Sequence, residues 1–228
     1  MKRTINYASL LLSATMLLFQ SCAFFDDDED MANKLDSKYE EQFSAQERAL
    51  ANTAQNEEYL STTEKEVYYY LNLARLNPAL FADTYVRKYD GAPGYSKGYA
   101  FDERKASLRE ELQKMSPLNV IKPDETLYED AECFATSMGE QGFTGHDRSK
   151  TPCGSIHHAE CCDYGDFKSG LTVVLDLLID SGENNASLGH RRIMLDDFEY
   201  MGVAQRKHKK YGRCTVLDFW RRAGGEHR

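Results

Sequence analysis

The sequence predicts an α+β fold, because helical patterns occupy its middle and strand patterns its end. Apolar residues recur at helical spacing over 63–86 and again over 127–142. Two short apolar runs, 201–205 and 214–219, then have the length and composition of β-strands. Helices followed by strands are typical of an α+β protein, in which helices pack on a sheet.

The N-terminus has the features of a secretory signal. Lys2 and Arg3 precede an apolar run from Ala8 to Phe19, which is too short to span a bilayer as a helix. The run leads into LFQSC, which resembles a bacterial lipobox, in which a small residue precedes the cysteine that becomes acylated. We therefore expect residues 1–21 to be a lipoprotein signal peptide and Cys22 to carry a membrane anchor. Ordinary cleavage, which would leave a plain thiol, is the alternative.

Residues 22–60 are predicted to be an acidic, disordered tether. Five consecutive acids, Asp26 to Asp30, repel one another and cannot be buried together. This run resembles the signal that directs some Gram-negative lipoproteins to the outer face of the outer membrane, so a cell-surface location is expected. A merely solvated leash is the alternative. Residues 31–60 are polar and lack Gly and Pro, which predicts a linker with weak helical tendency.

The charge of the chain argues against nucleic acid as a partner. The formal net charge is -9, and it becomes more negative when Lys2 and Arg3 leave with the signal peptide. Nonspecific nucleic-acid binding depends on neutralising phosphates with basic residues. One basic cluster lies between the two predicted strands, and we expect it to be a solvated hairpin turn, with contact to an anionic glycan or lipid headgroup as the alternative. It comprises Arg206, Lys207, His208, Lys209, Lys210 and Arg213.

The first helical segment is predicted to run from Thr63 to Val86. Thr62 or Thr63 can cap its start, and Glu66 is placed to close a capping box with Thr63. Pro78 has no backbone N–H and should divide the segment into two short helices.

Four further elements are expected before the strands. Residues 89–99 are rich in Gly and Tyr and predict a loop, and 101–115 predicts a charged surface helix. Leu127 to Gly142 is a second amphipathic helix with the glycine as its C-cap. Leu171 to Ile179 is almost continuously apolar, so its pattern alone fits a buried strand or a buried helix.

Five cysteines remain after Cys22, and disulfides are expected in an exported protein. An odd number leaves one thiol unpaired or bonded to another chain, and fifteen patterns with two bridges are possible. Cys153 with Cys161 or Cys162 closes the shortest plausible loop. A zinc site at the adjacent pair is the weaker alternative, because the chain has no C-x-x-C spacing. The five are Cys133, Cys153, Cys161, Cys162 and Cys214.

Two histidines and one acid are the candidate functional residues: His146 and His190, each preceded by Gly, and Glu160 between them. Their long, irregular spacing means that only a tertiary fold can bring them together. Two imidazoles and a carboxylate can bind a divalent metal ion or move protons. The alternative is that each is part of a separate polar network.

Several segments are similar, in order and spacing, to the CAP superfamily, which includes cysteine-rich secretory proteins, antigen 5 and plant pathogenesis-related proteins. The resemblance covers about residues 60–220 and implies a CAP (SCP-like) domain over 61–222 with a tail at 223–228. It implies an α-β-α sandwich, with a central antiparallel sheet between helical layers, and makes Leu171 to Ile179 a helix. The segments are YYYLNLARLNPALFADTYV (68–86), LNVIKPDETLYEDAECFATSMGEQG (118–142), GFTGHDRSK (142–150), HAECCDYGD (158–166), LLIDSGENNASLGHRRIML (177–195) and FEYMGVA (198–204).

The same resemblance implies a polar cleft built from two histidines and two acids. His146, Glu160 and His190 match three of these positions. Ser181 falls near the position of the second acid, and we expect its neighbours Asp180 and Glu183 to flank the site. Three ligands with an open fourth position would suit zinc or another divalent cation.

Three functions follow as hypotheses. The leading one, which the resemblance implies, is a noncatalytic exported domain that binds a lipid, glycan or protein. The second is a metal-dependent hydrolase that uses His146, Glu160 and His190. The third is a surface lipoprotein with an adhesive or structural role. Ser181 and Ser187 lie near His190 in sequence, but a serine triad requires a geometry that sequence does not show.

Overall fold

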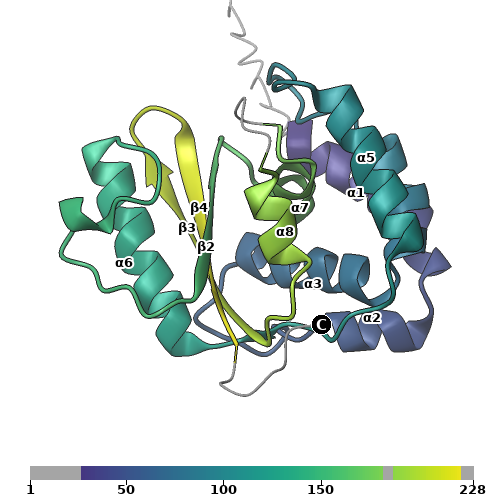
Figure 1. The fold of residues 1–228 in the computed structure, drawn as a ribbon, viewed down its shortest axis with the longest axis horizontal. Coiled ribbons are helices and arrows are strands. Elements are labelled where there is room, and N and C mark those ends of the chain that lie inside the picture. The colour runs from purple at the N-terminus through teal and green to yellow at the C-terminus, as the bar shows by residue number, and fades with distance from the viewer. Residues whose placement is uncertain (1–26, 182–186, 222–228) are drawn as a thin grey trace, which may run out of the picture.

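A four-stranded sheet with helices on both faces forms the centre of the molecule (Figure 1). The structure is a computed structural model that describes residues 27–181 and 187–221. The strand order is β1-β3-β4-β2, and neighbours are antiparallel except β1, which pairs in parallel with β3. The fold is therefore α+β as predicted, but the sheet is mixed and not purely antiparallel. Its strands are β1 (Lys122–Pro123), β2 (Ala159–Tyr164), β3 (Tyr200–His208) and β4 (Gly212–Trp220).

Helix α6 (Glu125–Gln141) covers one face of the sheet, while α3, α7 and α8 lie on the other (Figure 1). Two glycines let α6 lie directly on β3: a Cβ on Gly139 would stand 1.9 Å from the Lys207 carbonyl oxygen, and one on Gly202 2.1 Å from the Leu127 carbonyl carbon. The other helical elements are α3 (Thr62–Leu76), α4 (Pro78–Phe81), η2 (Ala82–Val86), α5 (Phe101–Lys114), η3 (Arg148–Lys150), α7 (Gly170–Ile179) and α8 (Gly189–Met194).

The helices predicted over 63–86, 101–115 and 127–142 are confirmed, and the ambiguous run over 171–179 is the helix α7. Pro78 divides the first segment as expected, because α3 ends at Leu76 and α4 starts at the proline. Gly142 adopts the left-handed conformation (φ 75°) and caps α6. The charged helix α5 is not only a surface element, since it buries side chains such as Leu108 and Leu112 in the core.

The cap of α3 differs from the one predicted. Ser61 is the N-cap, and its backbone N–H donates to the Glu64 carboxylate at 2.7 Å while its hydroxyl accepts from the Glu64 N–H at 3.3 Å. Thr63 and Glu66, the predicted pair, instead bind the segment before α7: the Thr63 hydroxyl donates to the Lys168 carbonyl, and the Glu66 carboxylate accepts from the Gly170 N–H, both at 2.8 Å. Thr63 and Glu66, which local spacing predicted to cap α3, therefore form tertiary contacts and not the cap.

The segment predicted as a disordered tether is largely helical between Asp27 and Ala51. It forms α1 (Asp27–Tyr39), η1 (Glu40–Gln42) and α2 (Ala45–Ala51). Tyr39 and Phe43 are buried in the main core, and the Asp36 carboxylate accepts hydrogen bonds from the hydroxyls of Tyr70 and Tyr85, both at 2.6 Å. Residues 31–60 have a polar composition, but these contacts pack the segment against the rest of the domain.

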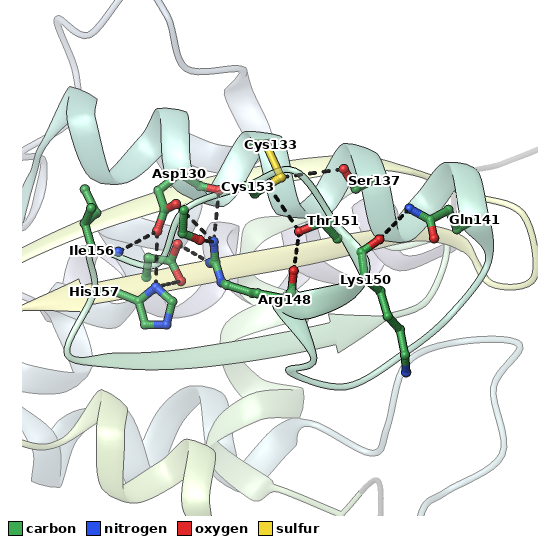
Figure 2. The surroundings of a disulfide bond; sticks show 12 residues. Asp130, Cys133, Ser137, Gln141, Arg148, Lys150, Thr151, Cys153, Ile156 and His157 are labelled. Carbon is green, nitrogen blue, oxygen red and sulfur yellow. Dashed lines mark hydrogen bonds and ion pairs between the residues drawn. A yellow bond between two sulfur atoms is a disulfide. The ribbon is translucent and has the colours of Figure 1, made fainter.

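One disulfide, Cys133–Cys153, joins α6 to the loop that precedes β2 (Figure 2). The expected pairing of Cys153 with Cys161 or Cys162 is wrong. Both of these cysteines lie in β2, where pairing with β4 holds them away from that loop, and they are buried free thiols, as is Cys214. The described chain thus contains one bridge and three thiols.

The strands β3 and β4 form the predicted hairpin, but only part of its basic cluster is a solvated turn. Lys209 and Lys210 are exposed, whereas His208 is buried and bonded through Nε2 to the Phe143 carbonyl at 2.9 Å. Arg206 forms an ion pair with Glu64 at 3.0 Å.

The predicted signal peptide, Cys22 and the tail at 223–228 lie outside the described residues. Within the ranges that are described, no helix combines the length and the apolar character needed to cross a bilayer.

Candidate functional site

His146 is held by Glu160 beside the edge strand β2. The His146 Nδ1 and the Glu160 Oε1 lie 2.7 Å apart, so the ring N–H donates to the carboxylate. His146 follows Gly145, whose φ of 94° turns the chain after α6 and whose N–H donates to the Tyr164 hydroxyl at 2.8 Å. The Glu160 side chain is buried, while the His146 side chain is 55% exposed. The acid therefore fixes a ring that faces solvent.

His190 is held in the same way by Asp180. The His190 Nδ1 lies 2.9 Å from the Asp180 Oδ1, and the His190 backbone N–H donates to the Asp180 Oδ2 at 3.1 Å. Asp180 ends α7 in the left-handed conformation (φ 59°), which places its carboxylate at the start of α8. Asp180, which was expected to flank the site, therefore holds His190 as Glu160 holds His146. Ser181 is buried, and Glu183 lies outside the described residues.

The two rings meet at the edge of the sheet. Successive residues of a strand face opposite sides of a sheet, and His146 contacts Cys162 while the His190 backbone contacts Cys161, so the two histidines reach β2 from opposite faces. Their ring centroids are 6.5 Å apart. Within the described residues neither Nε2 has a hydrogen-bond partner. We call these two residues the histidine pair.

Arg148 holds the far side of Glu160. Its Nε and Nη2 donate to the Glu160 Oε2 at 2.9 and 2.5 Å. Burial raises the pKa of Glu160, but the hydrogen bond from His146 and the charge of Arg148 outweigh it and keep the pKa below its usual value. Both oxygens of the Glu160 carboxylate therefore have hydrogen-bond partners, and the group is ionised at neutral pH. It is accordingly a weak proton acceptor.

Arg148 also contacts two other carboxylates. Its Nη1 lies 3.1 Å from the Asp130 Oδ1, and its Nη2 lies 2.7 Å from the Asp218 Oδ2. The guanidinium carbon lies 4.4 Å from the centre of the Phe134 ring, and the Arg148 side chain is only 9% exposed. One buried cation therefore joins three acids from α6, β2 and β4.

Cys162 lies beside His146 but does not have the properties of a nucleophile. Its Sγ is 3.7 Å from the His146 Nδ1, which already donates to Glu160. The thiol is buried, and burial raises its pKa well above the usual value. A reactive cysteine needs a lowered pKa and access to substrate.

An open depression of about 480 Å³ lies beside His146. His146 and Glu160 line it, whereas His190 is not among its lining residues. The other lining residues are Arg148, Ser155, His157, His158 and Ala159. The three residues predicted for one cleft are thus close together, but His190 approaches from the other side of the edge strand.

Sequence reasoning missed Arg148, Asp130, His157 and Asp218. Two of them carried a signal, because Asp218 interrupts an apolar strand and Asp130 lies beside the apolar face of α6. A charged residue within a buried pattern needs a partner, but the pattern does not identify the partner.

No model of a known protein family and no curated protein matches this chain.

Proposed function

We propose that this chain is an exported, lipid-anchored protein with a CAP-type domain that binds a ligand at the histidine pair without catalysing a reaction. One observation carries the proposal. Each imidazole is held through Nδ1 by a carboxylate with a lowered pKa, the rings lie with centroids 6.5 Å apart, and neither Nε2 has a hydrogen-bond partner among residues 27–181 and 187–221. Such carboxylate–histidine pairs fix the tautomer and leave the other nitrogen available to a ligand.

The same geometry argues against the hydrolase hypothesis. Glu160 would be the base in that hypothesis, but both of its carboxylate oxygens accept hydrogen bonds, one from His146 and one from Arg148. Its lowered pKa also opposes proton uptake at neutral pH. Cys162, whose Sγ lies 3.7 Å from the His146 Nδ1, is buried, and burial raises its pKa so that the thiol stays protonated. The pair is therefore better suited to binding than to acid–base chemistry.

The chemistry of the free nitrogens defines the class of ligand. In a neutral ring that donates from Nδ1, the Nε2 keeps a lone pair, which binds a cation or accepts a hydrogen bond from a hydroxyl. Two imidazoles on one tetrahedral zinc ion place their ring centroids about 5 Å apart, so a separation of 6.5 Å requires the exposed His146 ring to move inward. A divalent cation or a hydroxyl-bearing ligand such as a glycan fits this site.

The N-terminal sequence supports the proposed anchor at Cys22. The short segment after Cys22 limits how far the domain can lie from the membrane. Only residues 23–26 separate Cys22 from the first turn of α1. A chain of this length spans at most about 18 Å between the Cα atoms of Cys22 and Asp27. An acylated Cys22 would therefore hold the domain close to the membrane and not on a long tether.

Zinc titration followed by NMR of the imidazole resonances tests the histidine pair. We expect the His146 and His190 signals to shift together with one Kd at pH 7, and His190→Ala to abolish the His146 response. His158→Ala is the control, because this exposed ring stacks on Trp220, with ring centroids 5.1 Å apart, and belongs to neither carboxylate–histidine pair. Absence of a shared response would contradict cation binding at the histidine pair and leave a hydroxyl-bearing ligand as its only candidate.

Radiolabelled palmitate tests the anchor. The label should enter the wild-type chain and not Cys22→Ala, and the labelled chain should fractionate with the outer membrane. Equal labelling of both chains would refute lipidation at this residue.

A further inference from the structure

Asp130, His157 and Asp218 form a cluster next to the segment that the Cys133–Cys153 disulfide ties to α6. They come from α6, the loop before β2, and β4, and one donor atom of each lies within 4.8 Å of the other two. Figure 2 shows the His157 ring below α6, with its Nδ1 directed at the Asp130 carboxylate. None of these residues belongs to the histidine pair.

The spacing of the donor atoms fits a metal ion better than hydrogen bonds. The His157 Nδ1 lies 3.2 Å from the Asp130 Oδ2 and 3.3 Å from the Asp218 Oδ1. Hydrogen bonds between ionised groups are usually about 2.7–2.9 Å long. Ligand atoms around a tetrahedral ion with bonds of about 2.0–2.1 Å lie about 3.3–3.4 Å apart. The Asp218 Oδ1 is also buried without a hydrogen bond of acceptable geometry.

Arg148 orients both carboxylates for this role. Asp130 turns its Oδ1 to the guanidinium and its Oδ2 to His157. Asp218 divides its oxygens in the same manner, with Oδ2 on Arg148 at 2.7 Å and Oδ1 facing His157. Carboxylate ligands of metals are commonly held by such outer hydrogen bonds, which fix their direction.

The charge balance leaves room for a divalent cation. Three buried carboxylates, those of Asp130, Glu160 and Asp218, surround the one guanidinium of Arg148. Two negative charges thus remain, and a protonated His157 offsets only one of them. Burial raises the pKa of Asp218 to about 6, so the positive charges of Arg148 and His157 do not fully compensate this carboxylate. A bound divalent ion beside a neutral imidazole would balance the cluster.

The loop that carries His157 is anchored, yet an ion can reach it. The Cys133–Cys153 disulfide and the hydrogen bond from the Ile156 N–H to the Asp130 Oδ2 at 3.2 Å hold the loop against α6 (Figure 2). The His157 side chain is 12% exposed and lines the depression of about 480 Å³. That opening gives an ion a route and provides space for a water as the fourth ligand.

We propose that Asp130, His157 and Asp218 form a binding site for a zinc-sized divalent transition-metal ion, separate from the histidine pair. The imidazole nitrogen among the donors favours such an ion over Ca²⁺ or Mg²⁺, which prefer oxygen ligands. The ion is coordinated by the His157 Nδ1 and by the two facing carboxylate oxygens, and the Nδ1 proton is released to solvent.

Calorimetric titration with Zn²⁺ at pH 7 tests this site in a chain whose histidine pair is removed by His146→Ala and His190→Ala. We expect this double variant to bind one zinc ion, and further replacement by His157→Gln to weaken binding by about 100-fold or more. His158→Gln, at the neighbouring exposed residue, is the matched control and should leave the affinity unchanged. Asp218→Asn should weaken binding like His157→Gln.

The outcomes separate this site from the proposed function. A double variant that binds no zinc while retaining its native circular dichroism spectrum would overturn the second site. The same holds if His157→Gln binds zinc as tightly as His158→Gln. His157 lies at the surface of the cluster, so its variant keeps the test valid even if Asp218→Asn does not fold. Failure of the histidine pair would instead appear as unchanged imidazole resonances of His146 and His190.

Discussion

Arg148→Met tests how strongly one buried cation supports the candidate site. The guanidinium pairs with Asp130, Glu160 and Asp218 at 2.5–3.1 Å and is 9% exposed. Methionine keeps much of the packing on Phe134 but leaves these carboxylates without their shared partner. Removing one partner of a buried ion pair costs about 3–5 kcal/mol. We expect a loss of about 4 kcal/mol, or a fall in Tm of roughly 10 °C.

Urea unfolding followed by circular dichroism, at pH 7 and at pH 4.5, measures this loss. Arg148 stabilises the charged form of the carboxylates, and Glu160 accordingly has a lowered pKa. This stabilisation is present above the unfolded-state pKa and is lost as the pH falls, so the difference between variant and wild type should shrink in acid. Arg213→Met, whose ion pair with Asp166 is largely exposed, is the control and should cost less than about 1 kcal/mol. A loss below about 1 kcal/mol for Arg148→Met, or one that acid does not reduce, would refute the reasoning.

Three further predictions concern the surrounding fold. Cys133→Ser opens a loop of 20 residues and should cost about 3 kcal/mol in chemical unfolding; a wild type whose stability is insensitive to reductant would contradict this. Burial and mutual repulsion raise the pKa of Asp163, and burial raises that of Asp176 to about 6. The pair therefore favours folding at low pH and loses this contribution as the pH rises through about 6. Asp163→Asn should raise stability by about 1–2 kcal/mol at pH 7 and give no gain at pH 4 in thermal melts. Asp36→Ala removes the acceptor of two tyrosine hydroxyls, so it should cost about 1–3 kcal/mol and speed proteolysis within residues 27–60; unchanged cleavage there would show that α1 is held by other contacts.

Local pattern alone predicted most of the regular elements. The apolar spacing of α3 and α6, the break at Pro78 and the cap at Gly142 depend on residues within a few positions of one another. The hairpin of β3 and β4 was equally local. Such elements are set by backbone geometry and by side-chain period, which a sequence displays directly.

The N-terminal helices and the disulfide required the folded chain. Residues 31–60 have a polar composition, and only the packing of side chains such as Tyr39 and Phe43 into the core shows that they belong to the domain. Cys153 could pair with several cysteines at similar cost in loop closure, and the position of α6 brings Cys133 within reach, with the Cα atoms 5.7 Å apart.

The sequence by itself determined which residues near the site were unusual, namely His146, Glu160 and His190. It did not determine their partners. Arg148 and the group of Asp130, His157 and Asp218 come from different segments, and their contacts exist only once α6, β2 and β4 lie together. The contact of Asp180 with His190 likewise depends on how the chain turns between α7 and α8. A charge within an apolar pattern reveals that a partner is needed, because burial without one is costly. Which residue supplies that partner depends on distances of a few ångströms in space, and only the tertiary structure defines them.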